Sequence, residues 1–254
     1  MTITSESEKL SLIEGGKRLG RILQELKAKV APGVTTEELD AYAEQTIRDG
    51  GDEPSFLGYT PEGALRPYPA TLCISINSDV VHGIPNESVK TLKEGDLVSL
   101  DLGLTHDGIV VDAAITVPVG NVNEEEKKLL WATEEALSAG IAAAVPGNYV
   151  GDISSAIQEV IEKAGFKVVR ELGGHGVGNV VHEEPFVPNV GKKGDGELLE
   201  EGMVLALEPI ANAGKAAVIL SSDGYTFRTK DGSKSAHFEH TILIEKEGAR
   251  IITK

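Results

Sequence analysis

The chain has 254 residues, a length that allows one large domain or two small ones. Hydrophobic residues make up 41% of it and charged residues 25%, a mixture that excludes wholesale disorder. The formal net charge of −16 excludes nucleic-acid binding through a broad basic face. The single cysteine, Cys73, excludes an internal disulfide and a cysteine-based zinc cluster.

No targeting or membrane-spanning segment is predicted. The N-terminal residues lack the basic and apolar regions of a signal peptide, and no apolar run approaches the ~18 residues that a membrane span needs. We therefore expect a soluble, cytoplasmic protein that has no membrane partner and binds no nucleic acid.

Two helices are predicted in the N-terminal part of the chain. Leucine, isoleucine and valine recur at spacings of three, four and seven over residues 6–30, which indicates an amphipathic helix. A Pro-Gly pair ends it, and Thr35 with Glu38 then matches a capping box that opens a second helix. This second helix is expected to end near Gly50-Gly51.

A long loop and two strands follow. Residues 52–69 lose the helical period and carry four prolines, which predicts a loop. Loops of this length inside compact domains are usually functional or mobile. Strands are predicted over residues 72–77 and 97–104.

The second half of the chain repeats this order of elements. Helices are predicted from about residue 124 to 144 and over residues 153–164, with a second Pro-Gly pair between them. Strands are predicted over residues 167–169, 204–210, 217–220 and 238–244.

An internal echo relates the two halves. Residues 94–101 and 201–208 are alike at residue level, and each stretch ends in a carboxylate, Asp101 in the first and Glu208 in the second. The echo predicts two α/β halves, about 1–120 and 121–254, related by approximate symmetry within a single domain, 1–254. If the halves pack face to face, these two carboxylates meet at their shared centre.

A hairpin brings two aspartates together. Asp107-Gly108 is a strong turn signal between two β-rich runs, and opposed residues in such a hairpin have numbers that sum to an odd value. Asp101 and Asp112 therefore face the same side, within ~8 Å of each other. Their neighbours are apolar, so the pair needs a cation or a shared proton; the alternative is two solvated aspartates on an exposed face.

Two further carboxylates and a histidine extend this set. Glu208 and Glu239 each lie in an apolar strand, and His175 stands between glycines that clear space around its ring. Each glutamate alone could be a strand-edge residue that reaches water, but four unpaired buried carboxylates would each cost several kcal/mol. Oxygen ligands with one imidazole suit Mn²⁺, Fe²⁺ or Co²⁺, and four carboxylates suit two ions about 3.5–4 Å apart.

The remaining histidines divide into two groups. His82 and His182 lie in loops with glycine or proline nearby, and each is either an ordinary loop residue or part of a site. His106 in the hairpin turn is expected to be an ordinary residue. His240 is expected to be structural, because it alternates to the face opposite Glu239.

Taken in order, these residues resemble the methionine aminopeptidases. The resemblance rests on Asp101, Asp112, His175, Glu208 and Glu239, together with the stretches His82-Gly-Ile-Pro and His182-Glu-Glu-Pro, and it covers essentially the whole chain. The short spacing from His182 to Glu208 is similar to the type I enzymes. The implied fold is the α/β pita-bread fold, in which two pseudo-symmetric halves have helices outside a curved antiparallel sheet.

The resemblance implies a dinuclear metal centre. Asp101 would bind one ion, His175 and Glu208 the other, and Asp112 and Glu239 would bridge them. The implied reaction removes the N-terminal methionine from nascent proteins and peptides, by attack of a metal-bridging hydroxide on the first peptide bond.

The resemblance also implies a monomer that contacts the ribosome transiently. It further implies roles for individual residues near the scissile bond. Glu208 would assist proton transfer, His182 would stabilise the oxygen of the tetrahedral intermediate, and His82 would hydrogen-bond near the scissile amide. The residues that would bind the substrate are Phe56, Tyr59, Tyr68, Cys73, His82, Val181, His182 and Tyr225.

The chain departs from the common bacterial pattern of this family at several of these positions. Phe56, Val181 and Tyr225 replace a cysteine, a phenylalanine and a tryptophan, and about six extra residues lie within residues 60–67. His237 stands where a glutamine is usual, shares a face with Glu239, and would either support a ligand or bind a metal itself. These departures bear on side-chain preference and metal affinity.

Two other functions remain as alternatives. The divergent pocket is compatible with a pita-bread peptidase of altered specificity, such as a prolidase-like enzyme. A non-catalytic homologue that binds peptides is the second alternative, although such a protein has no use for clustered buried charges.

Overall fold

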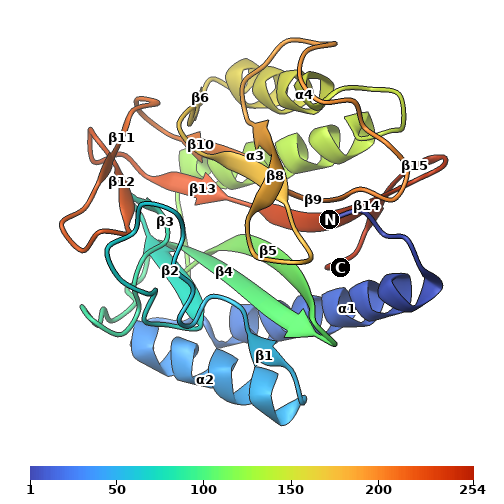
Figure 1. The fold of residues 1–254 in the computed structure, drawn as a ribbon. Helices are drawn as coiled ribbons and strands as arrows, with labels where there is room; N and C mark the ends of the chain where they lie inside the picture. Colours follow the sequence, from blue (N-terminus) through green and yellow to red (C-terminus); the bar gives the residue numbers. More distant parts are fainter.

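The computed structural model describes residues 1–254, with four helices on the two outer sides of a central set of strands (Figure 1). The helices are α1 (Glu6–Lys29), α2 (Thr36–Asp49), α3 (Glu124–Ala143) and α4 (Val150–Lys163). In Figure 1, α1 and α2 lie along the lower side of the molecule, and α3 and α4 lie along the upper side. None of the four helices combines the length and the apolar composition of a membrane-spanning segment.

Capping residues determine where the helices begin. The predicted capping box of Thr35 and Glu38 is confirmed: each side chain accepts the backbone N–H of the other residue. Asn123 and Glu126 form an equivalent box at the start of α3. The predicted start of α4 is three residues too late, since the helix begins at Val150 and not near Ile153.

The main sheet has nine strands and runs through both halves of the chain. Its order is β1-β4-β5-β14-β9-β7-β8, with β2 also on β4 and β15 on β14, and every pairing is antiparallel. Its strands are β1 (Glu53–Pro54), β2 (Leu72–Ile76), β4 (Leu97–His106), β5 (Ile109–Pro118), β7 (Gly173–Gly176), β8 (Glu183–Pro188), β9 (Val204–Leu207), β14 (Glu239–Glu245) and β15 (Gly248–Ile251).

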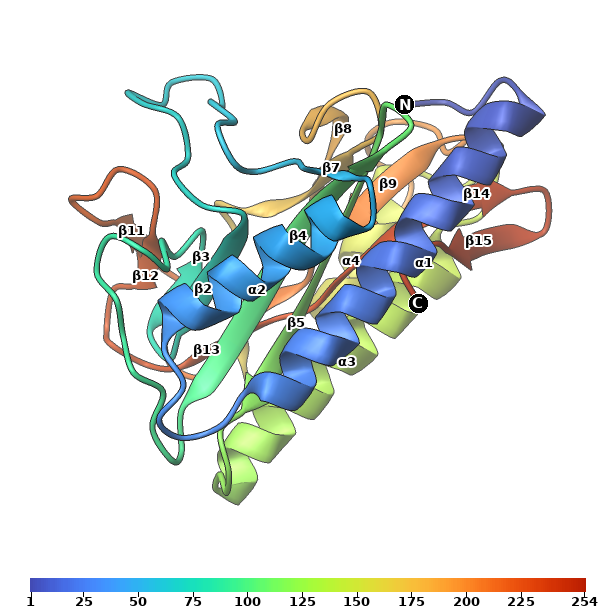
Figure 2. The same cartoon turned by 90° about the horizontal axis from the view of Figure 1, so that it is seen from below.

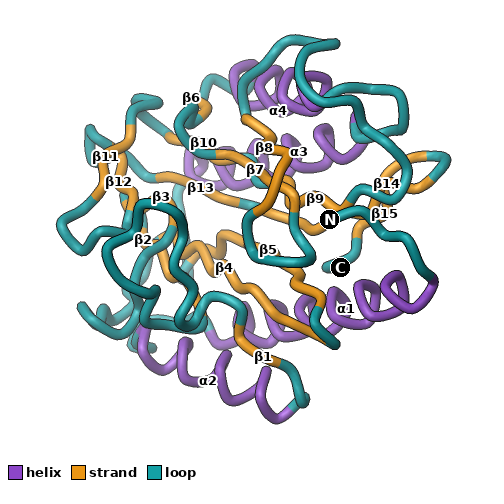
Figure 3. Tube along the Cα trace, in the orientation of Figure 1, coloured by secondary structure: helices purple, strands orange, loops and turns teal.

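Six shorter strands form two small sheets beside the main one (Figure 3). One contains β11 (Val218–Leu220), β12 (Phe227–Thr229) and β3 (Asp79–Val81). The other contains β13 (Ser235–His237), β10 (Ile210–Asn212) and β6 (Lys167–Val168).

Two predictions need correction, one for a strand and one for a loop. The predicted strand over residues 204–210 is two strands, β9 and β10, which belong to different sheets and are separated by Glu208 and Pro209. Proline cannot donate to a strand ladder, so the chain changes sheet at this point. The predicted loop over residues 52–69 contains the short strand β1, which pairs with β4.

The core consists of two main hydrophobic clusters. One gathers 32 buried residues around α1, α2 and the strands beside them, and the other gathers 22 around α3, α4 and β9. Helix α1 packs against β4 and β5 on the outer face of the sheet (Figure 2). The sheet continues from one half to the other where β5 pairs with β14. The mixed α/β architecture predicted from the sequence is confirmed.

Candidate active site

The β4–β5 hairpin positions two buried aspartates. His106 pairs with Ile109 across a turn in which Asp107 and Gly108 both have positive φ, as a two-residue hairpin turn requires. Asp101 opposes Ala114 and Asp112 opposes Gly103, so the two carboxylates are diagonal neighbours on one face. The predicted geometry is confirmed, and both side chains are buried, with 7% and 3% of each residue exposed.

Strands from the second half bring the other groups to the same place. Glu208 follows directly on β9, and its carbonyl oxygen accepts a hydrogen bond of 2.9 Å from Asn189. Glu239 begins β14 opposite Ala114. His175 lies in β7, and its Nδ1 contacts the carbonyl oxygen of Gly176 at 2.9 Å, which leaves Nε2 free to face the interior.

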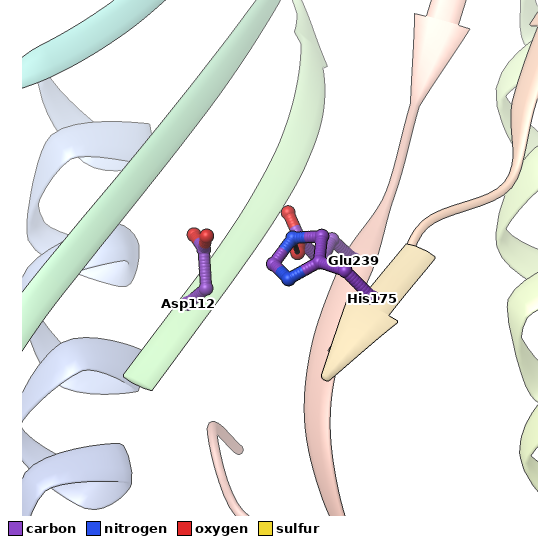
Figure 4. A group of neighbouring side chains, drawn as sticks. All are labelled: Asp112, His175 and Glu239. Carbon is purple, nitrogen blue, oxygen red and sulfur yellow. Dashed lines mark ion pairs between the residues drawn. The ribbon is translucent and has the colours of Figure 1, made fainter. Parts of the chain in front are cut away.

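These side chains converge although they are far apart in the sequence. Nε2 of His175 lies 3.9 Å from Oε1 of Glu208 and 4.0 Å from Oε1 of Glu239. One ligand atom each from Asp112, His175 and Glu239 fall within 4.8 Å of one another, and Figure 4 shows the Asp112 carboxylate across from the other two side chains. These three residues could hold a metal ion.

The electrostatics of the cluster fit a bound cation. Oδ1 of Asp101, Oδ1 of Asp112 and Oε1 of Glu239 are buried without a hydrogen-bond partner. Burial raises the pKa of Asp101 to about 7, and burial together with the neighbouring carboxylates raises the pKa of Asp112 and Glu239 well above the usual range. Divalent cations would neutralise these charges and satisfy the unpaired oxygens.

Two neutral histidines border the cluster. The hydroxyl of Tyr59 contacts Nδ1 of His182 at 3.1 Å, and the rings of His175 and His182 meet edge to face at 4.5 Å. Desolvation and the neighbouring rings of His175 and His82 lower the pKa of His182 to about 3, and desolvation lowers that of His82 to about 4, so both rings are neutral at pH 7.

The comparisons with known proteins agree with this site. The model of metallopeptidase family M24 matches residues 11–246. The chain belongs to family M24. It is 46% identical to the methionine aminopeptidase of Aquifex aeolicus, over 98% of this chain and 97% of that protein, and 46% identical to that of Clostridium perfringens, over 100% and 99%.

Solved structures give the same fold. The methionine aminopeptidase of Thermotoga maritima superposes with a TM-score of 0.94 at 40% identity, over 100% of both chains. The prolidase of Pyrococcus furiosus superposes at 0.75 with 23% identity over 65% of its chain, a likeness of fold alone. The antiparallel sheet with outer helices is therefore the pita-bread fold of these solved structures.

A partly open pocket in this M24 protein contains the carboxylate cluster. It is lined by Phe56, Tyr59, Pro61, Tyr68, Cys73, His82, Asp101, Asp112, His175, Val181, His182, Glu208, Tyr225 and Glu239. These are the thirteen metal, catalytic and substrate-binding candidates from the sequence, with Pro61 in addition. A second, more open cavity shares His82, His175, His182 and Glu208 with it.

The sequence reasoning missed Pro61 as a lining residue. Pro61 belongs to the extra residues 60–67, for which the sequence indicated only a difference in length. The loop is attached at its far end, where the hydroxyl of Tyr225 donates to the carbonyl oxygen of Arg66. How this loop lies over the pocket depends on such contacts, and no local pattern predicts them.

The other histidines lie outside the pocket. His106, expected to be an ordinary residue, contacts Oδ1 of Asp52 at 2.7 Å. His240, expected to be structural, contacts the hydroxyl of Thr253 at 2.9 Å. His237 is buried behind the cluster, with its Nε2 3.4 Å from Oε2 of Glu208.

Proposed function

We propose that this M24 protein is a metal-dependent aminopeptidase that removes the N-terminal methionine from peptides and nascent proteins. The observation that carries the proposal is the cluster of four carboxylates, three of them buried, with His175, in a pocket whose other lining residues are mainly apolar and aromatic. The relatives named methionine aminopeptidase, which match almost the full length of the chain, support the same reaction.

We infer that the cluster holds two divalent ions, with Mn²⁺, Fe²⁺ and Co²⁺ as candidates. Asp101 would hold one ion, His175 and Glu208 the other, and Asp112 and Glu239 both. When bound, such ions polarise the scissile carbonyl and lower the pKa of a water molecule. The oxygen-rich donor set and its unpaired oxygens support this assignment.

The side chains around the ions would bind and orient the substrate. Phe56, Tyr68, Cys73 and Tyr225 line the pocket that would receive the methionine side chain. The rest of the bound peptide would extend into the more open cavity next to His82.

Proton movement would involve His182 and Glu208. When the hydroxyl of Tyr59 donates to Nδ1 of His182, Nε2 carries the proton and can donate to the carbonyl oxygen of the scissile bond. Glu208 would accept a proton from the attacking water and return it to the leaving amine. His82, which is neutral as well, would hydrogen-bond near the same amide.

Hydrolysis of Met-Ala-Ser with added Mn²⁺ or Co²⁺, and with a chelator, tests the proposal. We expect methionine to be released only with metal, and Asp112→Asn to abolish both release and metal binding. Cleavage of Xaa-Pro peptides alone would support a prolidase-like enzyme instead. Metal-independent peptide binding without cleavage would support a non-catalytic homologue.

We also infer a monomer with one catalytic domain, 1–254, that acts in the cytoplasm on nascent chains and contacts the ribosome transiently. The continuity of the main sheet across β5 and β14 supports a single domain, and the free, buried Cys73 fits a reducing compartment. Sedimentation at the mass of one chain would support the monomer.

A further inference from the structure

His237 is a buried histidine that the pocket does not use. It is the last residue of β13, it is 1% exposed, and neither of its ring nitrogens has a hydrogen-bond partner. A buried polar group without a partner destabilises a fold, so its presence calls for an interaction that arises when the site is loaded.

The backbone of His237 is held in a fixed place against β5. Its N–H donates to Oγ1 of Thr116 at 2.8 Å, and the Thr116 hydroxyl donates to its carbonyl oxygen at 2.7 Å. Ser99 contacts the same threonine hydroxyl at 2.8 Å, within the buried interior. These bonds orient the imidazole from behind, independently of the pocket.

The imidazole faces two of the carboxylates in the cluster. Nε2 of His237 lies 3.4 Å from Oε2 of Glu208 and 3.7 Å from Oε2 of Glu239. By contrast, His175 approaches the Oε1 atom of each glutamate. Each glutamate therefore has one oxygen toward His175 and the other toward His237.

His237 could be a further metal ligand, or it could orient the glutamates that bind the metal. The five expected ligands all line the pocket, whereas His237 does not. A group behind the ligands that can donate an N–H orients them, which raises metal affinity without binding the metal. The geometry favours this supporting role over that of a further ligand.

We propose that His237 is a positioning residue that donates its Nε2–H to Oε2 of Glu208 and so directs Oε1 of that carboxylate to the metal. The proposal rests on the proposed function, because it requires that the cluster bind metal. Glutamine can place an N–H donor at a similar position, whereas leucine fills a similar volume without one.

The test compares His237→Leu and His237→Gln with the unchanged chain, by calorimetric titration of the metal-free protein with Mn²⁺ and with Co²⁺. We expect His237→Leu to weaken metal binding about 10- to 100-fold and His237→Gln to stay within about threefold. His240→Leu is the matched control, because this histidine contacts Thr253 outside the pocket and its loss should leave metal affinity unchanged.

Three outcomes would overturn the proposal. Metal binding by His237→Leu equal to that of the unchanged chain would leave His237 without a positioning role. Equal losses of metal affinity in His237→Gln and His237→Leu, together with a spectrum of bound Co²⁺ that indicates fewer nitrogen ligands, would show that the imidazole is a metal ligand. Absence of metal binding by the unchanged chain would overturn the proposed function as well.

Discussion

Asp40 shows how one buried side chain positions a wall of the pocket. Its Oδ1 accepts the backbone N–H groups of Thr71 and Leu72, both at 2.9 Å, and Cys73 of the pocket follows directly. Burial raises the pKa of Asp40, although the two backbone hydrogen bonds oppose this effect. The carboxylate thereby links α2 to the start of β2.

We predict that Asp40→Ala lowers the free energy of unfolding by about 2–3 kcal/mol, because two backbone N–H groups lose their partner in a buried place. Urea unfolding of the metal-free protein measures the change. Asp49→Ala is the control, since Asp49 is exposed and accepts only from Gln45. A loss below about 0.5 kcal/mol for Asp40→Ala would contradict the prediction.

At the scale of elements, the main sheet passes from one half to the other along a short seam between the strands β5 and β14. Their backbones pair only at Ala114 with Glu239 and at Ala113 with His240. Beyond this pair of contacts, the hydroxyl of Thr241 accepts the N–H of Asp112 at 2.9 Å and donates to its carbonyl oxygen at 2.8 Å. Thr116 makes the equivalent bonds to His237 at the other end.

We predict that Thr241→Val lowers the free energy of unfolding by about 1–3 kcal/mol and weakens metal binding, because both backbone groups of Asp112 lose their partner. Thr241→Ser keeps the hydroxyl and should restore most of both properties. Unfolding with chelator and titration with Mn²⁺ measure them. Equal behaviour of the valine and serine variants would show that the hydroxyl does not hold the seam.

The loop over the pocket is held by Arg66. Its guanidinium pairs with Glu87, with Nη2 2.7 Å from Oε2, and donates to the carbonyl oxygen of Asp223 at 3.2 Å. The same loop carries Pro61, which lines the pocket. These contacts are partly exposed, so each contributes little energy on its own.

We predict that Arg66→Ala raises KM for Met-Ala-Ser about two- to fivefold with little change in kcat, since the loop loses the contacts of the Arg66 side chain while the cluster is untouched. Steady-state kinetics measure the two constants. Arg48→Ala, which removes an exposed pair with Glu44 on α2, is the control. A fall in kcat at unchanged KM would point to an effect on the cluster itself.

At the scale of the whole molecule, the buried charges couple folding to metal and pH. Burial raises the pKa of Asp101 to about 7 and those of Asp112 and Glu239 well above their usual range. The folded, metal-free protein therefore holds protons that the unfolded chain releases, and its stability falls as the pH rises through these values. The lowered pKa values of His82 and His182 act in the other direction: they reduce the stability of the protein only as the pH falls below about 6.5, where the unfolded chain binds protons that the folded protein does not.

We predict that the Tm of the metal-free protein falls by several degrees between pH 6.5 and 8.5, whereas the Tm of the metal-loaded protein changes much less. A loss of about 1 kcal/mol corresponds to roughly 2–4 °C for a chain of this size. Scanning calorimetry with and without Mn²⁺ measures the difference. Asp112→Asn should flatten the metal-free curve, and parallel curves for the two forms of the unchanged chain would contradict the prediction.

Much of this structure follows from local patterns in the sequence. The helices could be predicted from apolar spacing and from capping residues such as Thr35 and Glu38, because both act within a few residues. The shared face of Asp101 and Asp112 follows from the period of a strand and the length of one turn. A carboxylate inside an apolar strand is also visible without coordinates, since its burial requires a partner.

Only the tertiary structure decided which of these groups meet. The break between β9 and β10, the lining role of Pro61, and the position of His237 behind Glu208 all depend on chain segments far away in the sequence. The short strands β1 and β12 have too little pattern to be predicted and form because a neighbouring strand offers hydrogen bonds. A sequence determines which side chains cannot remain unpaired in the interior, but their partners are set by how distant strands close around the same centre.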